Sequence, residues 1–244
     1  MDILAVAEID LNKCWTFAIG AIVIMLAVLS GPVSAKGPDF STLTEHSFEL
    51  SGVKLRFQLP GRLDKEFPSD PGENRVNIYD TKARESLLLL ERHWDYRSYI
   101  WRKQYALHSL IVSLENLPDD INVNLLKDIH GLQDVIEKNT KERYRKRNKK
   151  ISDDPNQAQI HHEVTLVFEQ KKIADVDVLK CIKTDNQSRS ITTTLYFIPV
   201  SEAHYVGFTF KTTPLEAGRK NPDKWVSQRN NDILKTMNTL TINY

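Results

Sequence analysis

The sequence contains little cysteine and no excess of either charge. Of its two cysteines, Cys14 precedes an apolar N-terminal segment and only Cys181 follows it, so the part of the chain after that segment has no internal disulfide. Residues 1–35 hold three acids and one base, which leaves 32 bases and 29 acids, a net charge of +3. This near-neutral balance argues against nucleic acid as the partner.

Catalytic signatures are also missing. The chain has no G-x-S-x-G, P-loop, C-x-x-C, H-E-x-x-H or dinucleotide-binding motif. Cys181 lies among apolar neighbours in VLKCIK, which favours a small buried side chain over a reactive thiol. We therefore expect a non-enzymatic protein that needs no cofactor.

The most informative segment is the uncharged run Trp15–Ser30, followed by Val33-Ser34-Ala35. Such a run is typical of a signal-peptide core or a short membrane anchor, and a buried core helix is the remaining interpretation. Val33 and Ala35 are small residues at the −3 and −1 positions of a cleavage site before Lys36. Basic residues before the run are scarce, so cleavage and anchoring both stay open. Either one places the protein in the periplasm or facing the periplasmic or extracellular side of a membrane.

The rest of the chain divides into a polar linker, residues 36–45, and a single α+β domain, residues 46–244. Alternating apolar residues on both sides of Ser51-Gly52 predict a β-hairpin that ends at Pro60-Gly61. Short strands are expected at 75–79 and 85–96. Apolar residues at helical spacing predict a helix over 100–117, stopped by Pro118, and a second helix from about 123 to 146.

The C-terminal part is rich in predicted strands. Segments 162–169, 173–183, 190–199 and 204–212 read as an antiparallel meander. A last helix is expected to begin at Pro222, with Asn221 as its N-cap and Asp223 in its first turn. The predicted apolar stripe of this helix comprises Val226, Ile233, Met237 and Leu240, with Trp225 beside it.

This order of elements resembles the PsbP/DcrB-like α/β/α sandwich family. The residues that carry the resemblance are FELSGVKLRFQLP, ITTTLYFIPVSEAHYVGFTFKTT and WVSQRNNDILKTMNTLTI, and it covers roughly residues 46–242. It implies an antiparallel sheet flanked by helices and a last helix that runs into a short hydrophobic tail. Members of this family are mostly non-enzymatic assembly factors, envelope lipoproteins and chaperones, so the resemblance implies no catalytic residues.

Two groups of residues are candidates for binding. The first, which we name the aromatic–arginine set, combines residue types that dominate interface hot spots, although half of it could instead pack in the core. It comprises Arg92, Trp94, Tyr96, Arg97, Tyr99, Trp101 and Arg102.

The second group is the basic segment, Lys138–Lys150, with eight basic residues and one acid. An acidic partner or an anionic membrane could use it, and a solvated helix end is the alternative. Its candidate contact residues are Arg143, Arg145, Lys146, Arg147, Lys149 and Lys150.

Two further patterns carry weaker chemistry. Glu91, His93 and Asp95 alternate and so share one strand face, where a carboxylate–imidazole pair could act in acid–base catalysis. His161, His162, Glu163 and His204 supply too few converging ligands to predict a metal site.

The sequence favours an exported protein-binding module, most specifically an inhibitor or immunity-type protein that neutralises an effector. An envelope assembly or chaperone-like factor is one alternative. A hydrolytic enzyme using the Glu91/His93/Asp95 face is the other.

Overall fold

The computed structural model describes residues 35–61, 75–79, 86–98, 103–118, 121–153, 162–173, 175–186 and 192–244. The chain divides into a unit of residues 1–34 and a unit of residues 35–244. The apolar run Trp15–Ser30 and Val33-Ser34 therefore lie outside the described residues. No helix among the described residues is long and apolar enough to cross a membrane.

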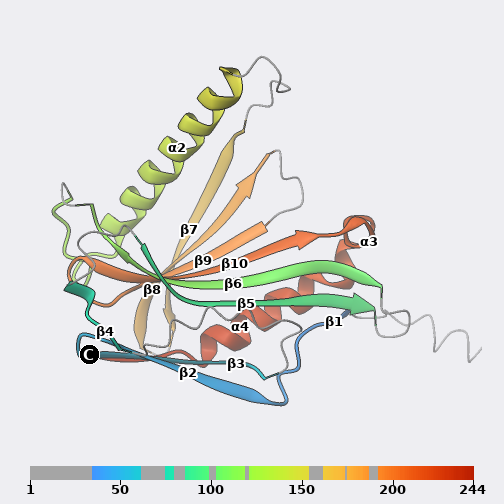
Figure 1. The fold of residues 1–244 in the computed structure, drawn as a ribbon, viewed down its shortest axis with the longest axis horizontal. Helices are drawn as coiled ribbons and strands as arrows, with labels where there is room; N and C mark the ends of the chain where they lie inside the picture. The colour runs from blue at the N-terminus through green and yellow to red at the C-terminus, as the bar shows by residue number, and fades with distance from the viewer. Residues whose placement is uncertain are drawn as a thin grey trace, which may run out of the picture. The chain divides into compact units, whose positions relative to one another are not determined.

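A large antiparallel sheet dominates the unit (Figure 1). In spatial order its strands are β1 (Ala35–Lys36), β5 (Ser86–Ser98), β6 (Gln104–Asn116), β10 (His204–Pro214), β9 (Thr192–Pro199), β8 (Val176–Asp185) and β7 (Val164–Ile173). The two-residue strand β1 and the strand β7 form its edges. The alternating pattern of apolar residues forms the expected meander, and each strand pairs with its neighbour along the chain from β7 to β10.

A smaller sheet contains the predicted hairpin. Ser51 and Gly52 connect its two long strands with φ values of 49° and 97°, the positive values that a two-residue hairpin turn requires. The C-terminal tail adds an edge strand, in which Ile242 pairs with Leu55. In spatial order the strands are β11 (Thr241–Asn243), β3 (Val53–Pro60), β2 (Leu43–Leu50) and β4 (Arg75–Val76).

The prediction of a helix over 100–117 is wrong, because Gln104–Asn116 form the long strand β6. Leu110 and Leu114 lie on its buried face, whereas Leu107 and Ile111 lie on the opposite face. Apolar residues on both faces of a strand can imitate helical spacing. Pairing with β5 and β10 on either side decides the conformation, since it satisfies the backbone of the whole segment.

The helices differ from expectation mainly at their ends. The second predicted helix begins and ends later, as α2 (His130–Ser152). A short helix α3 (Glu216–Lys220) and a 3-10 turn η2 (Pro222–Lys224) precede α4 (Val226–Asn238). Asn221 is not the N-cap of α4: its side chain donates to the carbonyl oxygen of Ala217 in the preceding helix.

Two apolar cores lie on opposite faces of the large sheet. The first fills the space between the large sheet, the small sheet and α4, with Phe57, Phe208, Trp225 and Met237 among its buried residues. The second lies between the other face of the large sheet and α2. The unit thus belongs to the α+β class, with two sheets and few helices. The small sheet was not expected to form a layer of its own.

Candidate functional site

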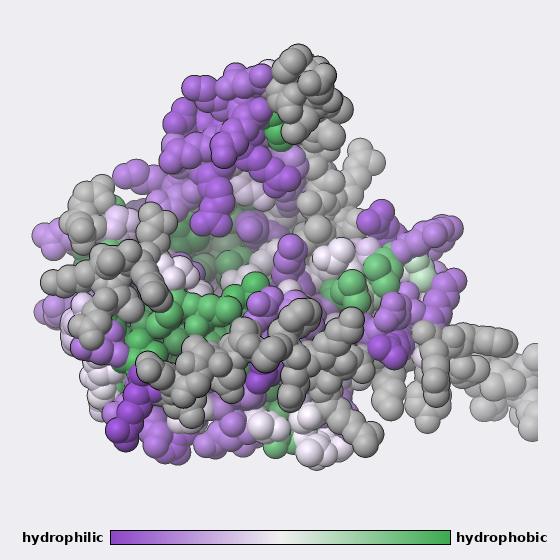
Figure 2. All heavy atoms as spheres, in the orientation of Figure 1, coloured by the Kyte–Doolittle hydropathy of each residue, from purple (hydrophilic) through white to green (hydrophobic). Residues whose placement is uncertain are grey.

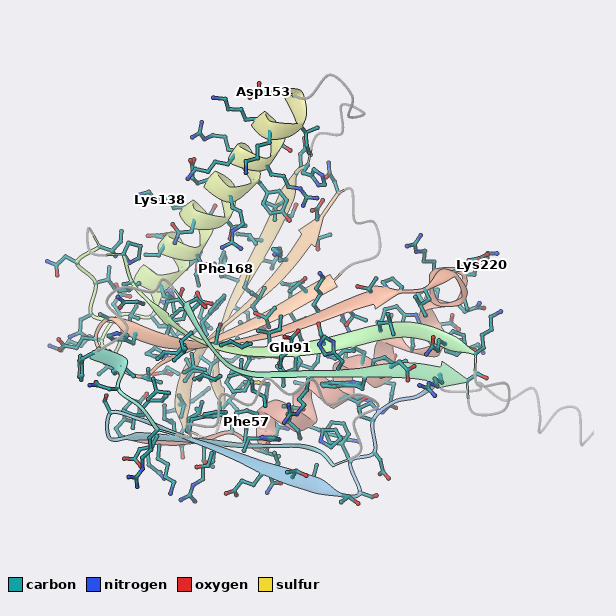
Figure 3. All side chains as sticks on the ribbon, viewed as in Figure 1. Phe57, Glu91, Lys138, Asp153, Phe168 and Lys220 are labelled. Atoms are coloured by element: carbon teal, nitrogen blue, oxygen red, sulfur yellow. The ribbon has the colours of Figure 1, made fainter. Side chains whose placement is uncertain are left out.

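Helix α2 covers only part of its face of the large sheet. The apolar residues of its first half, Leu132, Val135 and Ile136, pack with Cys181 and Phe197 of the sheet. Phe168 of β7 packs against the same cluster and is labelled beneath the helix in Figure 3. The second half of α2, between the labelled Lys138 and Asp153, has few apolar residues and needs another kind of anchor.

Polar contacts supply that anchor. The Tyr144 hydroxyl donates to Asp185 Oδ2 at 3.0 Å, and His162 Nδ1 lies 3.3 Å from Asp185 Oδ1. Asn148 donates to the carbonyl oxygen of His162 at 2.8 Å and accepts from its backbone N–H at 2.9 Å. We call these four residues the polar anchor. It connects the middle of α2 to β8 and to the start of β7, so the basic half of the helix is held in one orientation.

The anchored half carries the basic segment. All eight of its Lys and Arg side chains are exposed. Glu142 pairs with Arg145 at 2.7 Å and Lys146 at 3.8 Å, and Glu137 pairs with Lys141. Figure 2 shows the helix as a strongly hydrophilic surface above a hydrophobic area over the strands. Within the described part of the chain, the remaining five cations have no ion-pair partner: Lys138, Arg143, Arg147, Lys149 and Lys150.

The sheet face next to α2 carries two further lysines that the sequence analysis did not single out. Lys183 of β8 and Lys211 of β10 both pair with Thr193 of β9, one on each side. Lys183 lies two residues from Cys181 on the same strand and therefore points to the α2 side. Burial lowers the pKa of Lys183, the neighbouring charges of Arg143 and Lys211 lower it further, and the charge of Asp185 partly offsets them.

Most described members of the aromatic–arginine set belong to the first core. Arg92, Trp94 and Tyr96 are 7%, 4% and 0% exposed. The Tyr96 hydroxyl donates to Asp232 of α4, and Arg92 and Trp94 lie on the same face of β5 because alternate residues of a strand share a face. They therefore present no partner surface in the folded unit, which corrects the prediction for them. Tyr99, Trp101 and Arg102 lie outside the described residues.

Arg97 is the described member of the set that reaches the surface. Its side chain is 40% exposed and donates to both Asp95 carboxylate oxygens at 2.7 Å. Gln104 also donates to Asp95. Arg97 thus neutralises a carboxylate on the outer face of β5.

The Glu91/His93/Asp95 face forms as predicted, on the outer side of β5. Glu91 Oε1 lies 2.9 Å from His93 Nε2, and both side chains are about one-third exposed. Ser109 of β6 pairs opposite His93, but its hydroxyl donates to the Lys211 carbonyl oxygen at 3.5 Å. The carboxylates on this face are thus engaged by a neighbouring imidazole and a guanidinium.

A buried polar layer lies beneath α4. The Tyr96 hydroxyl donates to Asp232 Oδ2 at 3.2 Å, and Gln228 donates to Asp232 Oδ1 at 2.8 Å. His108 Nδ1 lies 2.6 Å from Thr212 Oγ1, and the His108 ring lies 4.6 Å from that of Trp94. Burial raises the pKa of Asp232 to about 6 and lowers the pKa of His108 to about 3. The fully buried Asp232 carboxyl contributes to packing under α4 rather than to an accessible site.

The histidines of the meander lie apart. His162 belongs to the polar anchor, whereas His204 Nδ1 lies 2.8 Å from Ser201 Oγ at the opposite end of the sheet. His161 lies outside the described residues. The part of the chain that the structure describes contains no group of three or more His, Cys, Asp or Glu residues that could hold a metal ion.

Neither the models of known protein families nor the curated proteins match this sequence. The geometry of α2 and of the sheet face beside it is therefore the basis on which a function can be inferred.

Proposed function

We propose that the chain is an exported, non-enzymatic binding module of the cell envelope that recognises an acidic protein through the basic half of α2. The observation that carries the proposal is the polar anchor, which holds this exposed, cation-rich helix in one orientation. Within this class, an inhibitor or immunity-type protein that neutralises an effector is the most specific proposal.

The rigidity of the helix supports recognition of a folded partner. A surface that is ordered before binding loses less conformational freedom in the complex than a flexible basic tail does. The five cations of the basic segment that have no ion-pair partner among the described residues can attract an acidic surface over a distance and speed its association. The basic segment, rather than the aromatic–arginine set, is therefore the proposed contact surface.

Export and the PsbP/DcrB-like α/β/α sandwich remain parts of this proposal. The uncharged run Trp15–Ser30 and the residues before Lys36 support export, by a cleaved signal peptide or a retained anchor. The resemblance supports a non-enzymatic role and keeps the envelope assembly or chaperone-like factor as an alternative.

A hydrolytic enzyme is the second candidate, because Glu91 and His93 form a carboxylate–imidazole pair. A nucleophile would have to stand within hydrogen-bond reach of the imidazole, and Ser109 opposite is engaged with a backbone carbonyl. Loss of a measured hydrolytic activity in His93→Ala would replace the binding proposal with this one.

The test of the binding proposal compares two sets of four substitutions. Lys146, Arg147, Lys149 and Lys150 are changed to Gln in one variant. The control changes four exposed lysines outside α2, namely Lys54, Lys103, Lys127 and Lys172, so that both lose the same charge. The protein captured from an envelope extract by the wild-type chain is identified and purified, and its association is measured at two salt concentrations.

We expect the α2 variant to associate with the captured protein at least about tenfold more slowly at low salt, since steering by a charged surface contributes about 10- to 1000-fold. The control variant should associate at nearly the wild-type rate. Equal effects of both variants would overturn the proposal. Binding to anionic vesicles, with no protein captured, would assign the basic segment to a membrane surface instead.

A further inference from the structure

Lys183 is a half-buried ammonium group without an ion-pair partner among the residues that the structure describes. Its side chain has no hydrogen bond and no ion pair with the residues that the structure describes. Buried or half-buried charges in proteins are ordinarily paired, because removal from water costs free energy that a partner must offset. The carboxylate next along this face, Asp185, is engaged by Tyr144 and His162.

The charges of two other cations, on different elements, act on Lys183. Lys211 lies on the far side of Thr193, and neighbouring strands are about 4.8 Å apart, so the two lysine Cα atoms are separated by about 10 Å. Arg143 precedes Tyr144, which contacts Asp185 two residues beyond Lys183. The charge of Arg143 reaches Lys183 and also Tyr205 of β10, the strand on the other side of β9.

The position between these cations suits an oxyanion. Lys183 and Lys211 flank Thr193 on the same face of the sheet, Thr193 is 5% exposed, and the charge of Arg143 on α2 reaches Lys183. The charge of Asp185 offsets part of their mutual repulsion, but no carboxylate forms an ion pair with any of the three in the described part of the chain. A bound anion would relieve that repulsion and give Lys183 its partner.

We propose that Lys183, Lys211 and Arg143 form an anion-binding site that takes an oxyanion group, a phosphate or a carboxylate. This site lies beside, and is distinct from, the four substituted residues that test the proposed function. It does not depend on the identity of a protein partner, because the purified chain can be examined with simple anions.

The experiment measures the thermal unfolding midpoint of the chain in the form isolated from the cell. Inorganic phosphate is titrated at constant ionic strength against sodium chloride. We expect phosphate to raise Tm by about 3–6 °C at ten times its dissociation constant, as mass action predicts for a chain of this size. Lys183→Met should remove this shift while its Tm in chloride equals or exceeds that of the wild type.

A matched control is available on the same strand. Lys180 is also half-buried, but it points to the opposite face of β8 and pairs with Glu169 at 3.1 Å. Lys180→Met removes the same charge and should keep the phosphate-dependent shift. The proposed site would be wrong if phosphate shifted the Tm of both variants equally. It would also be wrong if sodium chloride alone shifted the Tm of the wild type as much as phosphate does.

A second measurement distinguishes the sources of the anion. A short glutamate-rich peptide is added in place of phosphate and then in competition with it. Displacement of phosphate by the peptide, lost in Lys183→Met, assigns the site to carboxylates of a protein. A Lys183-dependent response to phosphate alone assigns it to a small oxyanion. No Lys183-dependent response to either anion would contradict the proposal.

Discussion

At the scale of single residues, burial beneath α4 shifts the pKa values of Asp232 and His108 in opposite directions. Tyr96 lies between them, bonded to Asp232 and 6.0 Å from the His108 ring. The pKa of Asp232 is raised to about 6, so its contribution to stability is full below its unfolded value and is lost as pH rises through 6. The pKa of His108 is lowered to about 3, so its contribution is lost as pH falls below the unfolded value near 6.5. The two effects oppose each other between about pH 4 and 6.

Replacing one of the two groups should reveal the pH dependence of stability that the other group causes. In Asp232→Asn the hydrogen bonds to the side chain can persist, but the carboxyl no longer titrates. The free energy of unfolding of the variant minus that of the wild type should increase by about 3 kcal/mol from pH 4 to pH 7. The reason is that each unit of pKa shift is worth about 1.4 kcal/mol. Denaturant unfolding at a series of pH values measures this difference.

His108→Gln is the complementary variant. It should lose stability more steeply than the wild type as pH rises from about 4 to 6, because only the Asp232 contribution then remains. If the stability of the wild type and of both variants changed with pH in the same way, folding would not change the pKa of either group.

At the scale of elements, α4 closes the first core between the two sheets. Met237 is fully buried and Ile233 is 3% exposed, whereas Leu234 on the same helix is 45% exposed. The helix also buries Arg229, Asp232 and Thr236, which an apolar stripe alone does not predict. The helix is thus seated by apolar contacts and by the polar layer together.

Shortening single side chains to Ala should affect stability differently on the buried and the exposed face of α4. Met237→Ala is expected to cost about 2–5 kcal/mol of unfolding free energy, through lost apolar contact and the cavity left behind. Leu234→Ala is the control and should stay within about 1 kcal/mol, because its side chain is already largely exposed. Urea unfolding midpoints give both values, and similar effects of the two changes would contradict this packing of the helix.

Strand β6 shows why the type of an element was harder to predict than its place. Its segment was located correctly, between Tyr96 and Leu117, but was assigned to a helix. A local pattern cannot report that β5 and β10 will pair on both sides of it, since β10 is about a hundred residues away. Long-range pairing overrides local spacing whenever both faces of a strand carry apolar residues.

At the scale of the whole molecule, export is the prediction that the sequence makes most directly. The described unit begins at Ala35, where Ala35 and Lys36 pair with Ser98 and Arg97 of β5. Cleavage before Lys36 would leave one of these two paired residues in place. We expect N-terminal sequencing of the chain from the periplasmic fraction to begin at Lys36.

The cellular fractions distinguish the alternatives. A chain recovered intact from membranes would indicate a retained anchor. A full-length chain found only in the cytosol would contradict export in either form. A strain blocked in secretion serves as the control, since it should accumulate the uncleaved chain if export is correct.

The sequence by itself determined the hairpin at Ser51-Gly52, the meander that ends at β10, the last helix and the α+β class. Each of these depends on short-range features: turn residues with positive φ, alternation along a strand, or an apolar stripe on a helix. The basic segment was visible for the same reason, because its residues are contiguous.

Only the tertiary structure decided which of these residues lie inside and which are brought together. It placed Arg92, Trp94 and Tyr96 in the core, because β5 turns that face toward α4. It also brought Lys183 and Lys211 to either side of Thr193, and brought Lys183 within reach of the charge of Arg143 on α2. Residue type and spacing record neither burial nor contacts between distant segments. Those follow from strand register and from the side of the sheet on which a helix packs.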